Sequence, residues 1–264
     1  MSRITPTFDR LRREGKTGLV AYLTVGFPSL AETPELLRAA VEGGADLIEL
    51  GIPFSDPLAD GTTVQRAAHH AVQSGITTAD VIDVCRKVRT GGIEAPIVAM
   101  GYYNPLLAYG IERFAEDAAA AGMDGVIPVD VPPEEGGHLK SALAAQDMDT
   151  IYLLAPTSSQ SRIERVTREG SGFIYCVSVA GTTGARGDLP PELEAFVGRV
   201  REKTALPLAV GFGVSRPEHV ARIGRVCEAA VVGSALIDTI ERAPAGQRAQ
   251  ELKTYVEVLT GRRG

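Results

Sequence analysis

Two acidic side chains, Glu49 and Asp60, occupy positions where acid–base chemistry competes with a purely structural role. Glu49 interrupts an apolar segment, residues 46–50, and the alternation of side chains along a strand would turn it inward. A buried acid is costly unless a cation pairs with it or a reaction uses it, and no lysine or arginine ends a neighbouring predicted strand. Asp60 precedes a Gly-Thr-Thr segment, so it could either cap the next helix or work beside Glu49.

The loop that leads to Asp60, residues 51–60, is unlike a solvated turn. It holds two prolines, two aspartates and the exposed apolar candidates Phe54 and Leu58. The prolines restrict its conformations, and its apolar side chains need a surface to cover. We therefore expect a lid over a site or a surface on which a partner docks.

Three glycine-rich loops follow the last three predicted strands. Their sequences are AGTTGARG (180–187), GFGVS (211–215) and GSAL (233–236), the last of them directly before a helix. Backbone N–H groups at glycines and at a helix start offer free donors and a positive dipole end to a phosphate dianion. Each glycine could instead only supply a tight turn, but three such loops in succession favour a phosphate site.

The remaining reactive side chains narrow the chemistry. Each lysine precedes the first strand or falls in or at the end of a predicted helix: Lys16, Lys87, Lys140, Lys203 and Lys253. A Schiff-base aldolase needs a lysine inside the barrel, so that mechanism is not expected. The histidines fall in helical stretches, where we expect solvent-facing positions and no catalytic metal: His69, His70, His138 and His219. Proton transfer remains, either in an isomerisation or in carbon–carbon cleavage of a substrate that supplies its own electron sink.

The elements that must position these groups form a repeating pattern. Short apolar runs, mostly non-alternating, are each followed by a turn and a longer helical stretch. The predicted strands are 19–25, 46–50, 97–100, 125–129, 150–154, 173–179, 208–210 and 229–232. The predicted helices include 8–14, 34–42, 64–74, 79–89, 111–121, 134–145, 191–203 and 217–223.

Eight βα units in one series favour a closed (β/α)₈ TIM barrel over an open doubly wound sheet. The short helix 8–14, before the first strand, could plug the lower mouth of this barrel. No proline-rich or low-complexity linker breaks the series, so residues 1–264 are expected to form a single domain. In such a barrel the catalytic groups lie at the carboxyl ends of the strands.

Composition excludes several classes of protein. The 264 residues are 44% hydrophobic and 23% charged, which rules out disorder and a collagen-like chain. A formal charge of -6 with dispersed basic residues argues against a nucleic-acid surface. Three scattered cysteines, no signal-peptide pattern at the amino end and no membrane-spanning stretch favour a reducing compartment, the cytoplasm.

At this point the residues resemble a known family. IELGIPFSDPLADG (48–61) is similar to the signature of the tryptophan synthase α subunit. The resemblance extends to AYLTVGFP (21–28), YNP (103–105), APT (155–157) and GFGV (211–214), which lie along most of the chain. It implies a lyase that cleaves indole-3-glycerol phosphate to indole and glyceraldehyde 3-phosphate by a retro-aldol step, for the synthesis of L-tryptophan.

The resemblance also implies roles for individual residues. The family's catalytic carboxylates fall on Glu49 and Asp60, and Tyr175 and Thr183 fall at positions near the substrate. Its phosphate-binding positions fall on Gly184, Gly213, Gly233 and Ser234. The apolar walls around indole could come from Tyr22, Met100, Ile127, Val129, Leu153 and Phe212. Protonation of the indole ring would supply the electron sink without a metal or a lysine imine.

The same resemblance implies a β-subunit partner in an α₂β₂ complex. That partner would hold pyridoxal phosphate and receive indole, and no cofactor is expected in this chain. Docking is expected at Pro53 and Asp56 in the lid loop and at the turn of Asn104 and Pro105. A docking role for this loop would explain why it carries the apolar residues Phe54 and Leu58.

Three residues depart from the family pattern: Thr62, where proline is usual, Thr182, where valine is common, and Val179, where some members have arginine. They leave lid closure and its coupling to the partner open. Two alternatives to a working α subunit stay open as well. One is a stand-alone indole-3-glycerol-phosphate lyase, and the other is a non-catalytic activator of the β subunit, against which the intact Glu49 and Asp60 argue.

Overall fold

The strands of the protein form one curled sheet in a computed structural model that describes residues 2–177, 192–211 and 213–263. Their bounds are β1 Gly18–Thr24, β2 Leu47–Gly51, β3 Ile97–Gly101, β4 Gly125–Pro128, β5 Asp149–Thr150, β6 Leu153–Leu154, β7 Ile174–Val177, β8 Leu208–Gly211 and β9 Ala229–Val232. They lie in the order β5-β4-β3-β2-β1-β9-β8-β7-β6, and the recorded pairings are parallel. The carboxyl ends of the strands therefore meet at one end of the sheet.

The two ends of this order, β5 and β6, are pieces of one strand that the sequence predicts as 150–154. The residues between the pieces continue the pairing on both sides. Ile151 N–H donates to the carbonyl of Val126 at 2.9 Å, and Tyr175 N–H donates to the carbonyl of Tyr152 at 3.1 Å. The fifth strand thus joins β4 to β7, and the sheet closes as the predicted (β/α)₈ barrel.

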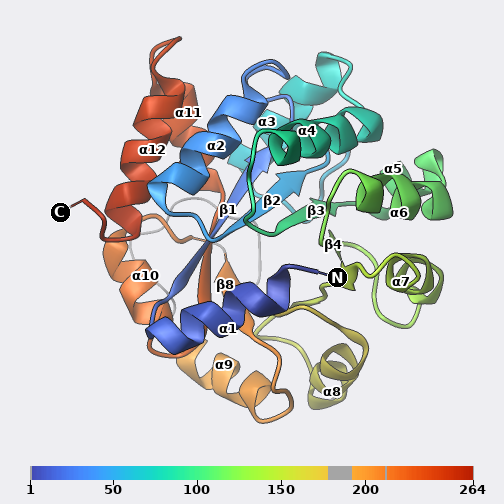
Figure 1. The fold of residues 1–264 in the computed structure, drawn as a ribbon. Coiled ribbons are helices and arrows are strands. Elements are labelled where there is room, and N and C mark those ends of the chain that lie inside the picture. The colour runs from blue at the N-terminus through green and yellow to red at the C-terminus, as the bar shows by residue number, and fades with distance from the viewer. Residues whose placement is uncertain (1, 178–191, 212, 264) are drawn as a thin grey trace.

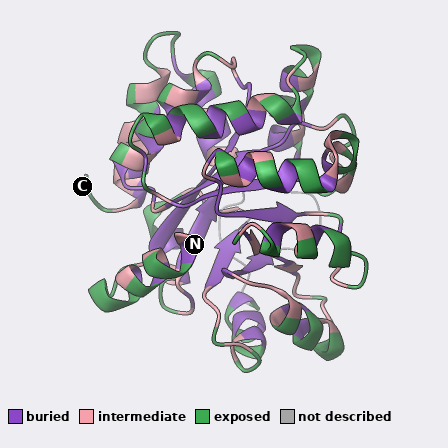
Figure 2. Ribbon diagram, turned by 45° about the vertical axis from the view of Figure 1, so that its right-hand side comes forward, coloured by how far each residue is buried: buried purple, intermediate pink, exposed green. Residues whose placement is uncertain are grey.

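The helices surround this barrel (Figure 1). Their bounds are α1 Ile4–Glu14, α2 Thr33–Gly43, α3 Thr62–Gln73, α4 Thr78–Thr90, α5 Tyr103–Tyr109, α6 Ile111–Ala120, α7 Gly137–Ala144, α8 Gln160–Glu169, α9 Leu193–Arg201, α10 Pro217–Ile223, α11 Ser234–Arg242 and α12 Arg248–Leu259. Figure 2 shows that the strands are buried and that the helices bury one face and expose the other. This is the burial expected where amphipathic helices cover a parallel sheet.

Two predicted helices begin three or more residues from their predicted start. The prediction for 134–145 is wrong at its start, because residues 134–136 form a turn in which the N–H groups of Glu135 and Gly136 both donate to Pro132 O at 3.0 Å. The paired glycines that follow have low helix propensity, so α7 begins only at Gly137. The amino-terminal helix begins at Ile4 rather than Phe8, because Ile4 is also buried.

Helix α1 closes the amino-terminal end of the barrel, as predicted. Phe8 packs against Phe173, just before β7, with ring centroids 5.7 Å apart. Arg10 binds Asp46, just before β2, at 2.8 Å. The backbone N–H and the guanidinium of Arg3 both contact Asp124, just before β4.

The acids at this end also bind strand backbones. Asp46 accepts from Leu19 N–H at 3.1 Å, Asp124 from Ile97 N–H at 2.8 Å, and Glu228 from Leu208 N–H at 2.8 Å. We call Asp46, Asp124 and Glu228 the basal acids. Because they are engaged with backbone and arginines, the functional site must be sought at the other end of the barrel.

Within the described ranges, no helix combines the length and apolar character needed to cross a membrane.

Candidate active site

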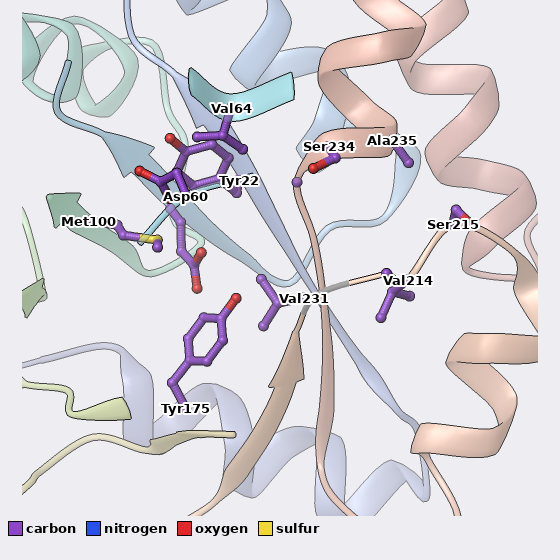
Figure 3. A pocket seen from close by; sticks show the side chains of 13 residues that line it. Tyr22, Asp60, Val64, Met100, Tyr175, Val214, Ser215, Val231, Ser234 and Ala235 are labelled. Carbon is purple, nitrogen blue, oxygen red and sulfur yellow. The ribbon is translucent and has the colours of Figure 1, made fainter. Parts of the chain in front are cut away.

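A cavity opens at the carboxyl ends of β1, β2, β8 and β9. It holds about 580 Å³ of empty space, including its open mouth. Its lining residues are Tyr22, Glu49, Asp60, Val64, Met100, Tyr175, Gly213, Val214, Ser215, Val231, Gly233, Ser234 and Ala235. Figure 3 shows Tyr22, Asp60 and Met100 on one side and Ser215, Ser234 and Ala235 on the other, with Tyr175 pointing into the space between.

Glu49 lies in β2 and is fully buried. Neither of its carboxyl oxygens has a hydrogen-bond partner among the described residues. Burial without a compensating donor disfavours the charged form and raises the pKa of Glu49 to about 8. The side chain is therefore a neutral acid at pH 7, with a proton that it can deliver into the cavity.

Asp60 is the second acid of the cavity and is 8% exposed. Its Oδ2 accepts a hydrogen bond from the hydroxyl of Tyr102 at 3.0 Å. Burial raises the pKa of Asp60 to about 6, while the Tyr102 hydrogen bond opposes that rise. Asp60 is thus mostly ionised at pH 7, and the two neighbouring acids differ in charge.

The helix-capping role of Asp60 is not supported by the geometry. Gly61 is the N-cap of α3, and no side chain caps this helix. The backbone of the Asp60 loop is held by Gln65 instead, whose amide donates to the carbonyls of Pro57 at 3.3 Å and Asp60 at 3.0 Å. The carboxylate is left free to face the cavity and Tyr102.

Two tyrosines flank Glu49, and glycines on the neighbouring strands make room for them. Tyr22 pairs with Glu49 in the β1–β2 register, and its hydroxyl shares a 3.2 Å hydrogen bond with Thr24. A Cβ on Gly51 would collide with the Tyr22 hydroxyl, and a Cβ on Gly211 would collide with that of Tyr175. Burial and the nearby acids raise the pKa of both tyrosines, so they stay neutral.

The opposite end of the cavity is built from backbone. Gly233 is the N-cap of α11, and Ser234 is the first residue of this helix. The first N–H groups of a helix have no acceptor within it, so those of Ser234 and Ala235 can meet an anion. Gly213 has φ +83°, a left-handed conformation that favours glycine.

The other residues predicted to contact the substrate do not all lie in this cavity. Met100 lines the cavity, whereas Ile127 is fully buried in β4 and is not among the lining residues. Val129 and Leu153 line a second hollow, over the ends of β4 and β6. Four predicted site or departure positions fall in 178–191 and one at 212, so Thr183, Gly184, Phe212, Val179 and Thr182 lie outside the described residues.

The predicted docking residues lie around the mouth of the barrel. Asp56 and Asn104 are exposed, Pro105 is half-buried and Pro53 is buried. Phe54 packs against Tyr102 with ring centroids 5.2 Å apart, so this apolar side chain covers the site itself. Leu58 and Leu107 are 84% and 47% exposed, which marks an apolar surface over the lid loop and α5.

The lysines and histidines lie on the outer helices and their ends. Lys16 follows α1 and Lys203 follows α9, while Lys87, Lys140 and Lys253 lie within helices. The expectation of solvent-facing histidines is wrong for His219, which is 3% exposed because its ring contacts Ser215 and Arg216. The described ranges contain no group of three or more His, Cys, Asp or Glu side chains placed to hold a metal ion.

Sequence reasoning missed Tyr102. The YNP motif begins one residue later, so the prediction covered the turn of residues 103–105 and not the strand end before it. A signal was present, because Tyr102 directly follows β3 at the carboxyl end of the barrel. Val64 and Val231 were missed too, since nothing in their local sequence indicates a cavity, whereas Ser215 ends the glycine-rich loop 211–215 that the sequence analysis singled out.

This fold and this site define a (β/α)₈-barrel enzyme whose cavity is suited to acid–base chemistry. Residues 8–261 match the sequence pattern of a family described as "Tryptophan synthase alpha chain". The alpha chain of Chloroflexus aurantiacus is 50% identical over 259 residues, or 98% of this chain and 97% of the relative. That of Geobacter sulfurreducens is 45% identical over 259 residues, or 98% of each.

Solved structures agree. The tryptophan synthase subunit alpha of Legionella pneumophila has a TM-score of 0.91 at 36% identity, covering 99% of this chain and 98% of that one. The tryptophan synthase of Mycobacterium tuberculosis has a TM-score of 0.91 at 33% identity, covering 100% and 99%. The chain belongs to the tryptophan synthase alpha chain family. It is a lyase of the α reaction, the cleavage of indole-3-glycerol phosphate, and an alpha chain implies a β-subunit partner.

Proposed function

We propose that Glu49 and Asp60 catalyse the retro-aldol cleavage of indole-3-glycerol phosphate in the cavity described above. The observation that carries this proposal is the full burial of an unpaired Glu49 in an apolar cavity. Its raised pKa, about 8, keeps it protonated at neutral pH, which is the state that a general acid needs.

The proposed reaction uses one proton of Glu49 in a cycle. The carboxylic acid donates its proton to C3 of the indole ring and forms an indoleninium cation. The resulting carboxylate then takes the proton of the glycerol hydroxyl next to the ring as the carbon–carbon bond breaks. The electron pair of that bond neutralises the indoleninium ion, indole and the aldehyde leave, and Glu49 is protonated again.

Asp60 would accept a hydrogen bond from the indole N–H and stabilise the positive charge as it develops there. A carboxylate with a pKa of about 6 is ionised at neutral pH, as this role requires. The interaction strengthens as the ring becomes cationic, so it favours the transition state over the bound substrate.

The phosphate of the substrate would lie at the backbone end of the cavity. Gly213, Gly233 and Ser234 belong to the lining there, and α11 directs its amino terminus to it. Gly184 would complete this cradle. Tyr22, Met100 and Tyr175 would contact the ring, with Thr183 and Phe212 as the further substrate-contacting residues.

The β-subunit partner would bind at the mouth of the barrel, in an α₂β₂ complex. Asp56, Asn104, Leu58 and Leu107 offer exposed polar and apolar groups for it, and Pro53 and Pro105 would shape the two turns. The partner would hold pyridoxal phosphate and use the released indole to make L-tryptophan.

Two broader assignments belong to the same proposal. One buried core connects all the strands, which supports a single domain over residues 1–264. The three cysteines are buried free thiols, which supports a reducing compartment, the cytoplasm.

The decisive experiment adds indole-3-glycerol phosphate to the isolated chain and follows indole release. Turnover is expected, and its absence under all conditions would favour the non-catalytic activator. Addition of β subunit is then expected to raise the rate strongly. No rate increase and no complex would favour the stand-alone lyase. Asp60→Asn serves as a control with strongly reduced activity, because it keeps the shape of the side chain and removes its charge.

A further inference from the structure

We propose that Tyr255 is a positioning residue for the phosphate end of the cavity, acting through the backbone of Ser215. The inference rests on the proposed function, because it assumes that the substrate phosphate lies beside Gly213, Gly233 and Ser234. It adds a residue of α12, the last described helix, whose sequence context gives no sign of such a role.

Tyr255 reaches the site through a single short hydrogen bond. Its hydroxyl donates to the carbonyl oxygen of Ser215 at 2.6 Å. Ser215 lies in the loop between β8 and α10 and lines the cavity together with Gly213 and Val214. Figure 3 places Ser215 and Val214 on the same side of the cavity as Ser234 and Ala235. Tyr255 therefore holds the loop that borders the proposed phosphate cradle.

In this loop the side chain of Val214 is buried in the core, whereas Gly213 has no side chain to hold its backbone in place. A Cβ on Gly213 would meet nothing within 4 Å, so this part of the loop faces open space. Its left-handed φ of +83° is also a conformation that glycine leaves readily. The N–H groups of such a loop can bind a phosphate tightly only if the backbone is already in place, since ordering it on binding costs affinity.

His219 contacts the other backbone group of Ser215. Its Nδ1 lies 3.3 Å from the Ser215 nitrogen, and its Nε2 lies 2.9 Å from the guanidinium of Arg216. A neutral imidazole has one acceptor nitrogen, so the ring can accept from Ser215 or from Arg216 but not from both. The hydrogen bond from the Tyr255 hydroxyl to the Ser215 carbonyl does not depend on which nitrogen of His219 is protonated. We therefore assign the positioning role to Tyr255 and not to His219.

The test is Tyr255→Phe, which removes the hydroxyl and keeps the packed ring. We expect the KM for indole-3-glycerol phosphate to rise about fivefold, the effect of losing one hydrogen bond, with kcat nearly unchanged. Inhibition by inorganic phosphate and by glycerol 3-phosphate should weaken by the same factor. A fall in kcat at constant KM, or no change in either constant, overturns the inference.

Tyr109→Phe is the matched control. Tyr109 is also half-buried and donates a 2.6 Å hydrogen bond, but to Asp117 on the outer helix α6. This variant is expected to keep the wild-type KM and phosphate inhibition. An equal rise in KM in the control would mean that loss of any such bond loosens the barrel, and the positioning role would then be wrong.

Ser234→Asp separates this inference from the proposed function. An aspartate at the start of α11 suits the helix dipole, so folding is preserved, but its charge repels a phosphate in the cradle. If Ser234→Asp leaves phosphate inhibition intact, the cradle itself lies elsewhere. If Ser234→Asp abolishes inhibition and Tyr255→Phe has no effect, only the role of Tyr255 fails.

Discussion

The Tyr102 hydroxyl donates a hydrogen bond to Oδ2 of Asp60 at 3.0 Å and accepts one from Ala59 N–H at 2.9 Å. One side chain at the end of β3 therefore holds both the acid and the backbone that carries it. Because the donated bond favours the ionised carboxylate, Tyr102 also keeps the pKa of Asp60 from rising further.

Tyr102→Phe is expected to raise the pKa of Asp60 above about 6 and to lower kcat/KM several-fold at pH 7. The physical reason is that the buried carboxylate loses its donor and binds a proton more readily. The measurement is the pH dependence of kcat/KM, whose acid limb should move to higher pH. Tyr103→Phe, at the next residue, is the control and should leave this limb in place.

Glu49→Gln is expected to lower kcat by about 10³-fold or more, because the amide can neither donate the proton to C3 nor take one from the hydroxyl. The cavity keeps its shape, so binding of glycerol 3-phosphate should change little. Indole release and a ligand titration measure the two effects. Turnover near that of the wild type would exclude Glu49 as the proton carrier.

A bell-shaped pH profile is expected for kcat/KM of the unmodified enzyme. Protonation of Asp60 removes the stabilising charge below about pH 6, and ionisation of Glu49 removes the acid above about pH 8. Between these values both groups are in the required state. In Asp60→Asn the residual activity should lose the acid limb only, whereas a limb that persists would come from another group.

Gly211→Ala is expected to reduce activity at least tenfold without unfolding the protein. A methyl group there collides with the hydroxyl of Tyr175 and must displace this ring, which lines the cavity. The double variant with Tyr175→Phe removes the colliding atom and should recover part of the loss. Failure to recover anything would place the damage in the barrel backbone, and thermal unfolding of both variants would detect it.

Leu107→Asp is expected to weaken binding of the β subunit at least tenfold while the isolated chain keeps its basal activity. The side chain is 47% exposed on α5, and a charge there opposes burial in an apolar interface. Association with β subunit and the rate increase that it causes are the measurements. Leu58→Asp is a less clean test, since this loop also carries Asp60.

The barrel could be predicted from the sequence because its strands are short apolar runs and its helices carry regular apolar faces. The predicted element boundaries are wrong where tertiary contacts determine where a strand or helix begins and ends. Pairing through Ile151 and Tyr152 continues the fifth strand across a break in its regular geometry. At α7, residues 134–136 form a turn, so the helix begins at Gly137 rather than at Glu134.

The acids could be predicted because Glu49 is conspicuous in an apolar strand, and the position of Asp60 suggested two roles for it. The hydrogen-bond partner of Asp60 could not be predicted, since a tyrosine such as Tyr102 is ordinary in sequence and lies 42 residues away along the chain. His219 illustrates the same limit: its helical periodicity does not reveal that the loop before it covers the ring.

The basal acids and α1 hold the strands together at the end of the barrel opposite to Glu49 and Asp60. Thermal tolerance could therefore be adjusted at the basal acids, which are not among the residues that line the cavity. A lineage or an engineer could strengthen that end for a warmer habitat while leaving Glu49 and Asp60 in place.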